Sequence, residues 1–587
     1  MMPISARVPP APRRSYAALP LLWAAVVLVL TLTPANEMPR TPVWELLSFD
    51  TAAHAGVFAV LAGLSWFSLR RQQRWPRVAR YVGTVALLGS ILFGGLIEVL
   101  QQTMGLGRHG DWTDLLGDGI GAALVVGAAT LWSFQKARRV QRLASVCGLT
   151  AMLVGTAPSG QAQDMARARQ TIEKLAAPEM HGRGYVQQGE HAAAAYLRTR
   201  FREWKLEPLA PAYTQSFMLD VNTFPGDVKL RVFPPNKSNK NSFSLKPGAD
   251  FIVAPGAPSL PQRVYHVVRA DTLALNNSAA QAAAVLSGDA DSLPREVLLL
   301  RQRDEKKLQQ PENAGLLARW EATYAARIVL VDKLTSSVES SQARQPRLEV
   351  LASKWPVAPA GQPTYDDVEL QIDAQLQRNY QTQNLAAVIR GSTQPDSFLV
   401  VSAHYDHLGT MGKDVYFPGA NDNASGVALL LELAAHYAKP ENRPACSVVF
   451  LLFGAEEAGL VGSSYFVQHP LVPLSRIKFL FNLDLLGTGE QGATVVNGRV
   501  LEVPYQRLVA LNEARQYLPA LGARGPAANS DHYPFSQAGV PAFFLYTRGG
   551  SAAYHDVNDR PAALSLAGFA GAFGLVRDFL NRMGAAR

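Results

Sequence analysis

Two histidines and several carboxylates in the C-terminal half of this sequence could bind a metal ion. The apolar run FLVVSAH ends at His404, and Asp406 follows two residues later. The run CSVVFLLFGA leads into the adjacent pair Glu456 and Glu457, and Asp484 comes directly after the run FLFNL. Because burying a lone carboxylate beside an apolar strand is expensive, this pattern favours a site in which the acidic groups have a partner.

Two further candidate ligands stand in predicted loops. Asp422 lies in GANDNASG, where it could also cap the helix that follows, and His555 lies in AAYHDVND. The combined set of three carboxylates and two imidazoles suits Zn²⁺, which accepts nitrogen and oxygen ligands. Two such ions ~3.5–4 Å apart can share a bridging carboxylate. The sequence therefore predicts a zinc site built from His404, Asp422, a carboxylate of the Glu456–Glu457 pair, Asp484 and His555.

The elements that must position these residues alternate between strand and helix patterns. Runs such as SFLVVSAH and CSVVFLLFGAEE are nearly continuous in apolar residues, and ASGVALLLELAAHYA between them has helical periodicity. This alternation predicts an α/β domain with a mostly parallel central sheet and helices on both faces. In such sheets ligands gather at the carboxyl ends of the strands. We assign this domain to residues 164–214 and 376–587, with a small β-rich domain inserted at 215–375.

Six segments of this domain together resemble the M28 family of zinc aminopeptidases: SAHYDHLG, GANDNASGVALLLELA, LLFGAEEAGLVGS, NLDLLG, SDHYPFSQAGVPAFFL and YHDVND. The resemblance spans about residues 165–587, and the insertion lies where many members carry a protease-associated domain. It implies that His404, Asp422 and Asp484 hold one zinc ion. Asp422 would bridge to a second zinc ion, which Glu457 and His555 would also hold.

The same resemblance implies catalytic roles for neighbouring residues. Glu456 would be the general base, and Asp406 would orient His404. Tyr554 would stabilise the oxyanion, and His532 would contact substrate. The implied activity is zinc-dependent hydrolysis of the N-terminal peptide bond of peptides with a free N-terminus, with two Zn²⁺ per chain.

Other functions remain open at this point. The same metal core serves glutaminyl cyclases, carboxypeptidases and dipeptidases, and the substrate could be a peptide derived from the cell envelope. A binding module without activity is a further alternative, but it would be favoured by loss of a ligand or of Glu456, and all of these residues are present.

The N-terminal part of the chain has a different composition. Residues 1–142 hold fourteen Lys and Arg against seven Asp and Glu, so they contribute +7 of the net charge of +9. The remaining residues are close to neutral, which argues against nucleic-acid binding. Apolar segments approaching the ~20 residues of a membrane-spanning helix predict a four-helix transmembrane bundle; they lie at residues 16–34, 52–69, 81–104 and 115–134.

Arginines flank these segments in the alternation of the positive-inside rule, which places the N-terminus in the cytoplasm. The polar residues in FDTAAHAGVF and GLIEVLQQTMGLGRHGDWTDLLGDGIG resemble the VanZ-like membrane family over about residues 16–135. Residues 143–163, a fifth apolar segment and a linker, look like a secretory signal in mid-chain. This segment would export everything after it, either as a fifth, short membrane helix or with cleavage near Ala162. We therefore expect a multi-pass protein of the bacterial cytoplasmic membrane, in contact with the lipid bilayer, with its peptidase domain outside.

Overall fold

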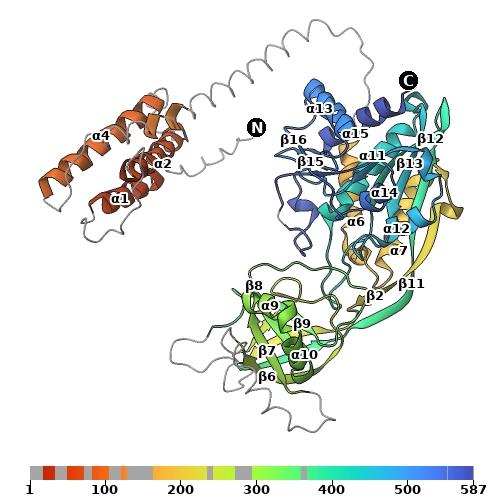
Figure 1. The fold of residues 1–587 in the computed structure, drawn as a ribbon, viewed down its shortest axis with the longest axis horizontal. Coiled ribbons are helices and arrows are strands. Elements are labelled where there is room, and N and C mark those ends of the chain that lie inside the picture. The colour runs from red at the N-terminus through yellow and green to blue at the C-terminus, as the bar shows by residue number, and fades with distance from the viewer. Residues whose placement is uncertain are drawn as a thin grey trace, which may run out of the picture. The chain divides into compact units, whose positions relative to one another are not determined.

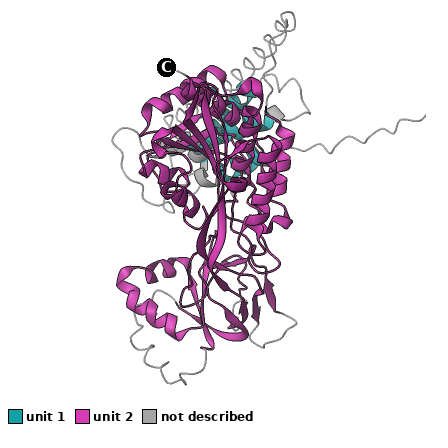
Figure 2. Cartoon of the chain, turned by 90° about the vertical axis from the view of Figure 1, so that its right-hand side faces the viewer, with its two compact units in different colours: residues 1–160 teal, residues 161–587 magenta. Residues whose placement is uncertain are grey.

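The computed structural model describes most of the C-terminal three quarters of the chain and three helices near the N-terminus (Figure 1). The described residues are 18–32, 49–71, 82–104, 121–123, 125–127, 163–233, 242–270, 294–357, 366–551 and 553–585. The chain divides into two compact units, residues 1–160 and 161–587 (Figure 2).

The first unit is helical. Its main elements are α1 (Ala18–Leu32), α2 (Phe49–Arg71) and α4 (Val82–Met104). They pack through a small apolar cluster, in which all three helices take part: Val27, Phe58, Leu61 and Ile97.

The membrane predictions fall on this unit. Within the part of the chain that the structure describes, no helix combines the length and the apolar character that crossing a membrane requires. The predicted transmembrane bundle is therefore unsupported. Most of the fourth predicted segment, and residues 143–162 of the signal-like segment, lie outside the described residues.

The second unit contains two sheets. The larger has nine strands in the order β1-β11-β13-β12-β14-β17-β15-β16, with β2 also paired to β11. Their bounds are β1 (Glu207–Pro208), β2 (Thr214–Thr223), β11 (Gln375–Ile389), β12 (Gln394–His404), β13 (Cys446–Phe453), β14 (Ile477–Leu483), β15 (Ala493–Val496), β16 (Leu521–Ala523) and β17 (Ala542–Thr547). The central strands β13, β12, β14 and β17 are parallel, whereas β11 and β15 join the neighbouring strands antiparallel.

Both faces of this sheet are covered, as the apolar strands predicted. In β12, Leu399 and Val401 pack into one core, while Phe398 and Val400 pack into another on the opposite face. The first core also holds side chains of α6 (Met165–Leu175), α7 (Gly189–Glu203), α11 (Gly426–Tyr437), α13 (Glu502–Arg515) and α15 (Phe569–Gly584). The second holds side chains of α12 (Val461–Gln468) and α14 (His532–Gln537).

The smaller sheet lies within the predicted insertion. Its eight strands run in the order β4-β3-β10-β6-β7-β8-β9-β5. They are β3 (Val228–Phe233), β4 (Phe243–Leu245), β5 (Phe251–Val253), β6 (Leu260–Arg269), β7 (Glu296–Arg301), β8 (Ala326–Val331), β9 (Arg347–Leu351) and β10 (Asp367–Ile372), accompanied by α9 (Gln302–Leu308) and α10 (Ala314–Thr323). β2, which the sequence had placed in the insertion, instead pairs with β11 in the larger sheet, so these two strands lead out to the inserted domain and back.

Candidate metal centre

The carboxyl ends of three parallel strands bring the predicted ligands together. His404 is the last residue of β12 and lies beside Phe453 of β13, so the Glu456–Glu457 turn follows next to it. On the other side, Ser402 of β12 pairs with Asn482 of β14, which places Asp484 at the same edge. Asp422 comes from the short turn Ala420–Ser425 that precedes α11.

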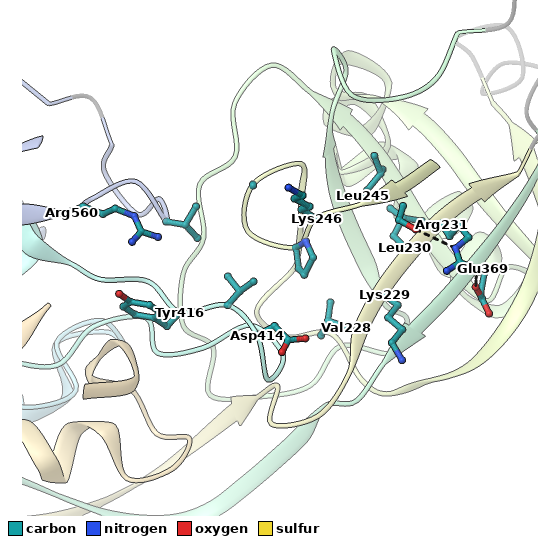
Figure 3. A pocket seen from close by; sticks show the side chains of 15 residues that line it. Val228, Lys229, Leu230, Arg231, Leu245, Lys246, Glu369, Asp414, Tyr416 and Arg560 are labelled. Atoms are coloured by element: carbon teal, nitrogen blue, oxygen red, sulfur yellow. Dashed lines mark hydrogen bonds and ion pairs between the residues drawn. The ribbon is translucent and has the colours of Figure 1, made fainter. Parts of the chain in front are cut away.

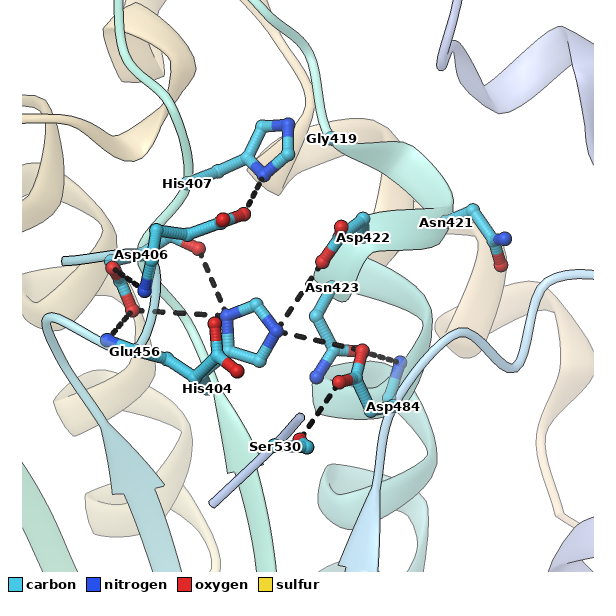
Figure 4. Close-up of polar contacts among 12 residues, drawn as sticks. His404, Asp406, His407, Gly419, Asn421, Asp422, Asn423, Glu456, Asp484 and Ser530 are labelled. Atoms are coloured by element: carbon cyan, nitrogen blue, oxygen red, sulfur yellow. Dashed lines mark hydrogen bonds and ion pairs between the residues drawn. The ribbon is translucent and has the colours of Figure 1, made fainter. Parts of the chain in front are cut away.

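Two groups of ligand atoms meet at Asp422. In the first group, His404 Nε2 lies 3.3 Å from Asp422 Oδ1 and 3.5 Å from Asp484 Oδ1 (Figure 4). His555 Nε2 lies 3.2 Å from both Asp422 Oδ2 and Glu457 Oε2. All five predicted ligands thus converge, and the two oxygens of Asp422 face different histidines.

The electrostatics of the group favour positive charge. Burial by itself lowers the pKa of His404, but Glu456 and Asp484 hold that pKa well above its ordinary value. Burial likewise opposes protonation of His555, yet Glu457 and Asp422 raise its pKa to about 11. Clustered carboxylates of this kind stabilise positive charge in the group, whether it is carried by an imidazole or by a bound cation.

This donor set fits zinc. Atoms of His404, Asp422 and Glu457 lie within 4.8 Å of one another, as do atoms of His404, Glu456 and Asp484. Asp484 Oδ1 is buried without a hydrogen-bond partner among the described residues, which leaves a charged oxygen directed into the group. Buried nitrogen and carboxylate donors at this spacing are those that Zn²⁺ takes in catalytic sites.

Asp406 contacts both His404 and the turn that carries Glu456 and Glu457. Its main-chain carbonyl accepts a hydrogen bond from His404 Nδ1 at 3.3 Å, and its carboxylate lies 3.7 Å from the same nitrogen. The carboxylate accepts the main-chain N–H groups of Glu456 and Glu457, at 3.1 and 3.3 Å. Asp406 therefore lies where it can orient His404, as predicted, and it also fixes the turn that carries the predicted base.

Glu456, the predicted base, points into the group (Figure 4). Burial raises its pKa well above the ordinary value, and the neighbouring Asp531, Glu457 and Asp484 add to this effect against the opposing charge of His404. Burial also raises the pKa of Asp531 to about 7. Asp531 is thus a buried acidic neighbour of Glu456 to which the sequence had assigned no role.

Tyr554 and His532, the two residues predicted to act on substrate, lie in different surroundings. The ring of Tyr554 stacks on that of His555 with 3.8 Å between centroids, and the residue is 48% exposed, so it lies at the mouth of the site. His532 is fully buried and packs against Phe544, with 5.4 Å between ring centroids. Among the described residues, neither of its ring nitrogens has a hydrogen-bond partner, so no recorded contact joins it to the predicted ligands.

Two further polar side chains, His407 and Ser530, hold the ligands in place. His407 Nδ1 donates to Glu457 Oε1 at 2.7 Å. Ser530 Oγ donates to Asp484 Oδ2 at 2.9 Å and accepts from Asn482 at 2.8 Å. Hydrogen bonds of this kind to metal-binding residues fix their orientation. The position of His407 three residues after His404, and of Ser530 in the segment SDHYPF, were the available signals.

Asp559 and Arg183 fix the backbone around Asp422. The buried carboxylate of Asp559 accepts the main-chain N–H groups of Asn421 and Asp422 at 2.9–3.0 Å. Arg183 is fully buried and donates to the carbonyls of Tyr405, Leu175, Pro418, Gly419 and Asp422 at 2.7–3.0 Å. At Gly419 (φ 57°) a Cβ would collide with the carbonyl of Asp422, so glycine is needed there. Hydrogen bonds to Asp559 and to Arg183 therefore fix the backbone of the loop before α11.

The inserted domain also reaches the site. Ser336, in the loop between β8 and β9, accepts a hydrogen bond from His555 Nδ1 on its main-chain carbonyl at 2.8 Å. Its N–H donates to the carbonyl of His555 at 3.2 Å. The first bond places the proton on Nδ1 and leaves Nε2 facing Asp422 and Glu457, which is the arrangement that a metal ligand needs.

Residues 384–580 match the family model described as Peptidase family M28. We refer to the domain that contains this match as the M28 domain. Curated relatives include a "Probable zinc metalloprotease" of Pyricularia oryzae, 41% identical over 113 residues, which are 19% of this chain and 22% of that protein. Aminopeptidase YwaD of Bacillus subtilis is 32% identical over 170 residues, or 28% of this chain and 35% of that protein. The chain thus spans about a third or less of the length of these two relatives.

The M28 domain and its insertion share their overall fold with a solved structure. The zinc aminopeptidase BSAP from Bacillus subtilis aligns with a TM-score of 0.51 at 19% identity, covering 72% of this chain and 95% of that one. These comparisons support the α/β M28 fold predicted from the sequence. They do not support the predicted VanZ-like membrane domain.

Proposed function

We propose that this chain is a zinc-dependent aminopeptidase that hydrolyses the N-terminal peptide bond of peptides. The observation that carries the proposal is the position of Asp422, whose two carboxylate oxygens face His404 and His555 at 3.3 and 3.2 Å. A further carboxylate stands beside each histidine, so the residues form two ligand groups that share one bridging side chain. The names of the curated relatives, a zinc metalloprotease and an aminopeptidase, support the same activity.

Two zinc ions, one held by His404, Asp422 and Asp484 and the other by Asp422, Glu457 and His555, would supply Lewis-acid activation of the attacking water and the scissile carbonyl. The protein's own residues handle the proton. Glu456 would accept it from the water on its carboxylate and give it to the leaving amine, so that the peptide bond breaks without a covalent enzyme intermediate.

Other side chains prepare Glu456 and its surroundings for this step. Asp406 holds the turn at Glu456 and Glu457 by two main-chain hydrogen bonds, which keeps the base in one position. Burial of the group excludes bulk water and strengthens each electrostatic interaction within it. Tyr554, at the exposed mouth of the site, is placed to meet substrate and remains the candidate donor to the oxyanion.

The test uses the purified full chain beside its Glu456→Gln variant. We expect two zinc ions per chain, release of the N-terminal amino acid from free peptides, and no release from the same peptides after N-acetylation. The variant should retain its zinc and lose at least ~10²-fold in kcat, the low end of the range for removing a general base. Release of C-terminal residues, cyclisation of N-terminal glutamine, or equal cleavage of acetylated peptides would instead identify one of the alternative activities.

We propose further that the N-terminal unit tethers the enzyme to the bacterial cytoplasmic membrane, with the M28 domain outside. The apolar segments and flanking arginines of the sequence support this. So does one exposed apolar face of α4, formed by Val85, Leu88, Leu92, Leu96 and Val99. Membrane fractionation of cells, followed by protease treatment of spheroplasts, tests both parts: the enzyme should sediment with membranes and be digested from outside.

A further inference from the structure

A cavity of about 540 Å³ lies between the inserted sheet and the M28 domain (Figure 3). One wall consists of β3 and the segment 244–249 of the inserted domain. The other wall consists of residues 414–416 together with Val557 and Arg560 of the M28 domain. The volume is within the range of sites that hold small molecules or parts of larger ligands.

The lining carries four cationic and two acidic side chains. Lys229 lies 2.8 Å from Asp227, and Arg231 lies 3.5 Å from Glu369, so carboxylates of the protein already neutralise these two cations. For Lys246 and Arg560 no ion pair is recorded among the described residues. The cavity therefore offers two cations to a ligand, with Asp414 as the acidic group that stands without an ion pair in the same part of the structure.

The two cations differ in how they are held. The guanidinium of Arg560 lies 5.9 Å from the centre of the Tyr416 ring, an arrangement that fixes the arginine without neutralising it. Lys246 is exposed and comes from the opposite wall, after the edge strand β4 (Figure 3). The two cations thus stand on opposite walls of the cavity, one on the inserted domain and one on the M28 domain.

The remaining lining is apolar, which favours a ligand that has apolar groups as well as a charge. Val228, Leu230, Leu245, Val415 and Val557 face the same space. Arg560 and Tyr416 also line a second hollow of about 430 Å³, whose other walls include Arg169 and Glu173 of α6. Two hollows that share a wall, with apolar and charged parts, suit an elongated ligand such as a peptide.

Residues that line the cavity are close in sequence to residues of the metal centre. Val557 follows the predicted ligand His555 by two residues. Arg560 directly follows Asp559, whose carboxylate holds the N–H groups of Asn421 and Asp422. One loop thus contributes to the metal centre, to the support of its bridging carboxylate, and to the cavity wall.

We propose that this cavity binds the C-terminal portion of the peptide substrate, with Lys246 and Arg560 holding its terminal carboxylate. The proposal rests on the proposed aminopeptidase activity, since a peptide whose N-terminus lies at the metal centre must extend away from it. It makes the inserted domain a determinant of substrate length and of C-terminal charge.

The experiment compares the full-length protein with Lys246→Gln, Arg560→Gln and the control Lys307→Gln, whose side chain is exposed on α9 outside the cavity. Substrates are leucine-initiated alanine peptides of two to six residues, each made with a free C-terminal carboxylate and as the C-terminal amide. Steady-state rates give KM and kcat for each. Leucine p-nitroanilide, which has no downstream residues, reports the metal centre alone.

For peptides long enough to reach the cavity, we expect amidation to raise KM about tenfold in the wild type and to leave kcat within about twofold. Lys246→Gln and Arg560→Gln should abolish this difference between carboxylate and amide, whereas Lys307→Gln should keep it. Lys246→Gln should cleave leucine p-nitroanilide as fast as the wild type. If amidation has no effect at any length, or if its effect survives Lys246→Gln, the proposal is overturned.

A binding measurement separates this proposal from the proposed activity. N-acetylated peptides that carry a fluorophore on an internal side chain are titrated with each protein, and anisotropy reports binding without turnover. Tighter binding of the carboxylate form, lost in Lys246→Gln, supports the cavity even if no peptide is hydrolysed. Equal binding of carboxylate and amide forms refutes it even if the enzyme is an active aminopeptidase.

Discussion

Replacing Arg183 by lysine should loosen the metal centre although the residue touches none of the predicted ligand atoms. Arg183 is fully buried and makes five hydrogen bonds to main-chain carbonyls, two of which belong to Gly419 and Asp422. Another goes to Tyr405, between His404 and Asp406. The guanidinium thereby joins the end of β12 to the loop that carries the bridging carboxylate.

The size of the expected loss in stability follows from the hydrogen bonds that lysine cannot make. Arginine offers three nitrogens in a fixed fork, whereas lysine carries its three donors on one nitrogen and can reach only some of the carbonyls. At least two buried carbonyls lose their partner, at about 1–3 kcal/mol each. We therefore expect Arg183→Lys to lower the free energy of unfolding by about 2–6 kcal/mol and to weaken zinc binding by tenfold or more.

The assay is urea unfolding of the metal-free protein, together with zinc titration against a chromophoric chelator. The control is Arg390→Lys: this arginine also forms a fork, onto Glu207, but both side chains are well exposed. Its replacement should cost less than about 1 kcal/mol and leave zinc affinity unchanged. If Arg183→Lys matches this control in both measurements, the carbonyl contacts do not position the metal ligands.

Three further perturbations address other parts of the site. Asp559→Asn removes one of the oxygens that accept the N–H groups before α11, and zinc affinity by chelator competition should fall about tenfold. Ser336→Pro deletes the N–H that donates to the carbonyl of His555, so the second zinc equivalent should bind more weakly, while Ser336→Ala should bind both as before. Burial lowers the pKa of His532 to about 4, so its contribution to stability is complete above about pH 6.5 and is lost as the pH falls towards 4, by up to roughly 3 kcal/mol. Metal-free His532→Phe should lack this loss in unfolding titrations, and an identical pH profile would show that the imidazole is not buried in the neutral form.

Three of the ligands could be predicted from the sequence because each stands at the end of an apolar run. His404 ends an apolar run, and Asp484 interrupts one, in strands that are buried on both faces. In a parallel sheet such positions share one edge, so the order of the runs was enough to bring them together. Asp422 and His555 were only candidates by residue type, because loop residues carry no periodic signal, and the family resemblance gave them their places in the ligand set.

The supporting contacts could not be predicted because their partners are main-chain atoms. The carbonyl that accepts the proton of His555 Nδ1 belongs to Ser336, some 219 positions away in sequence, and any residue type offers the same oxygen. The five acceptors of Arg183 are likewise carbonyls, so no pair of residue types marks the contact. The pairing of β2 with β11 was missed for a related reason: β2 alternates buried and exposed residues like the strands of the inserted sheet, and only its partner distinguishes it.

The contact between Ser336 and His555 has a consequence for how the inserted domain can vary. Leu334 is buried in the core of the inserted sheet, and Val338 packs against a separate cluster that includes Tyr185 and Phe217. The packing of Leu334 and Val338 fixes the loop on either side of Ser336, whose main-chain carbonyl and N–H both form hydrogen bonds with His555. Because the backbone makes both bonds, they need no particular side chain at this position, although Ser336 is buried and proline would remove the N–H. A change of one residue in the spacing between Leu334 and Val338, in contrast, would move the carbonyl away from Nδ1. The length of this loop, rather than its composition, is therefore what couples the inserted domain to the metal centre.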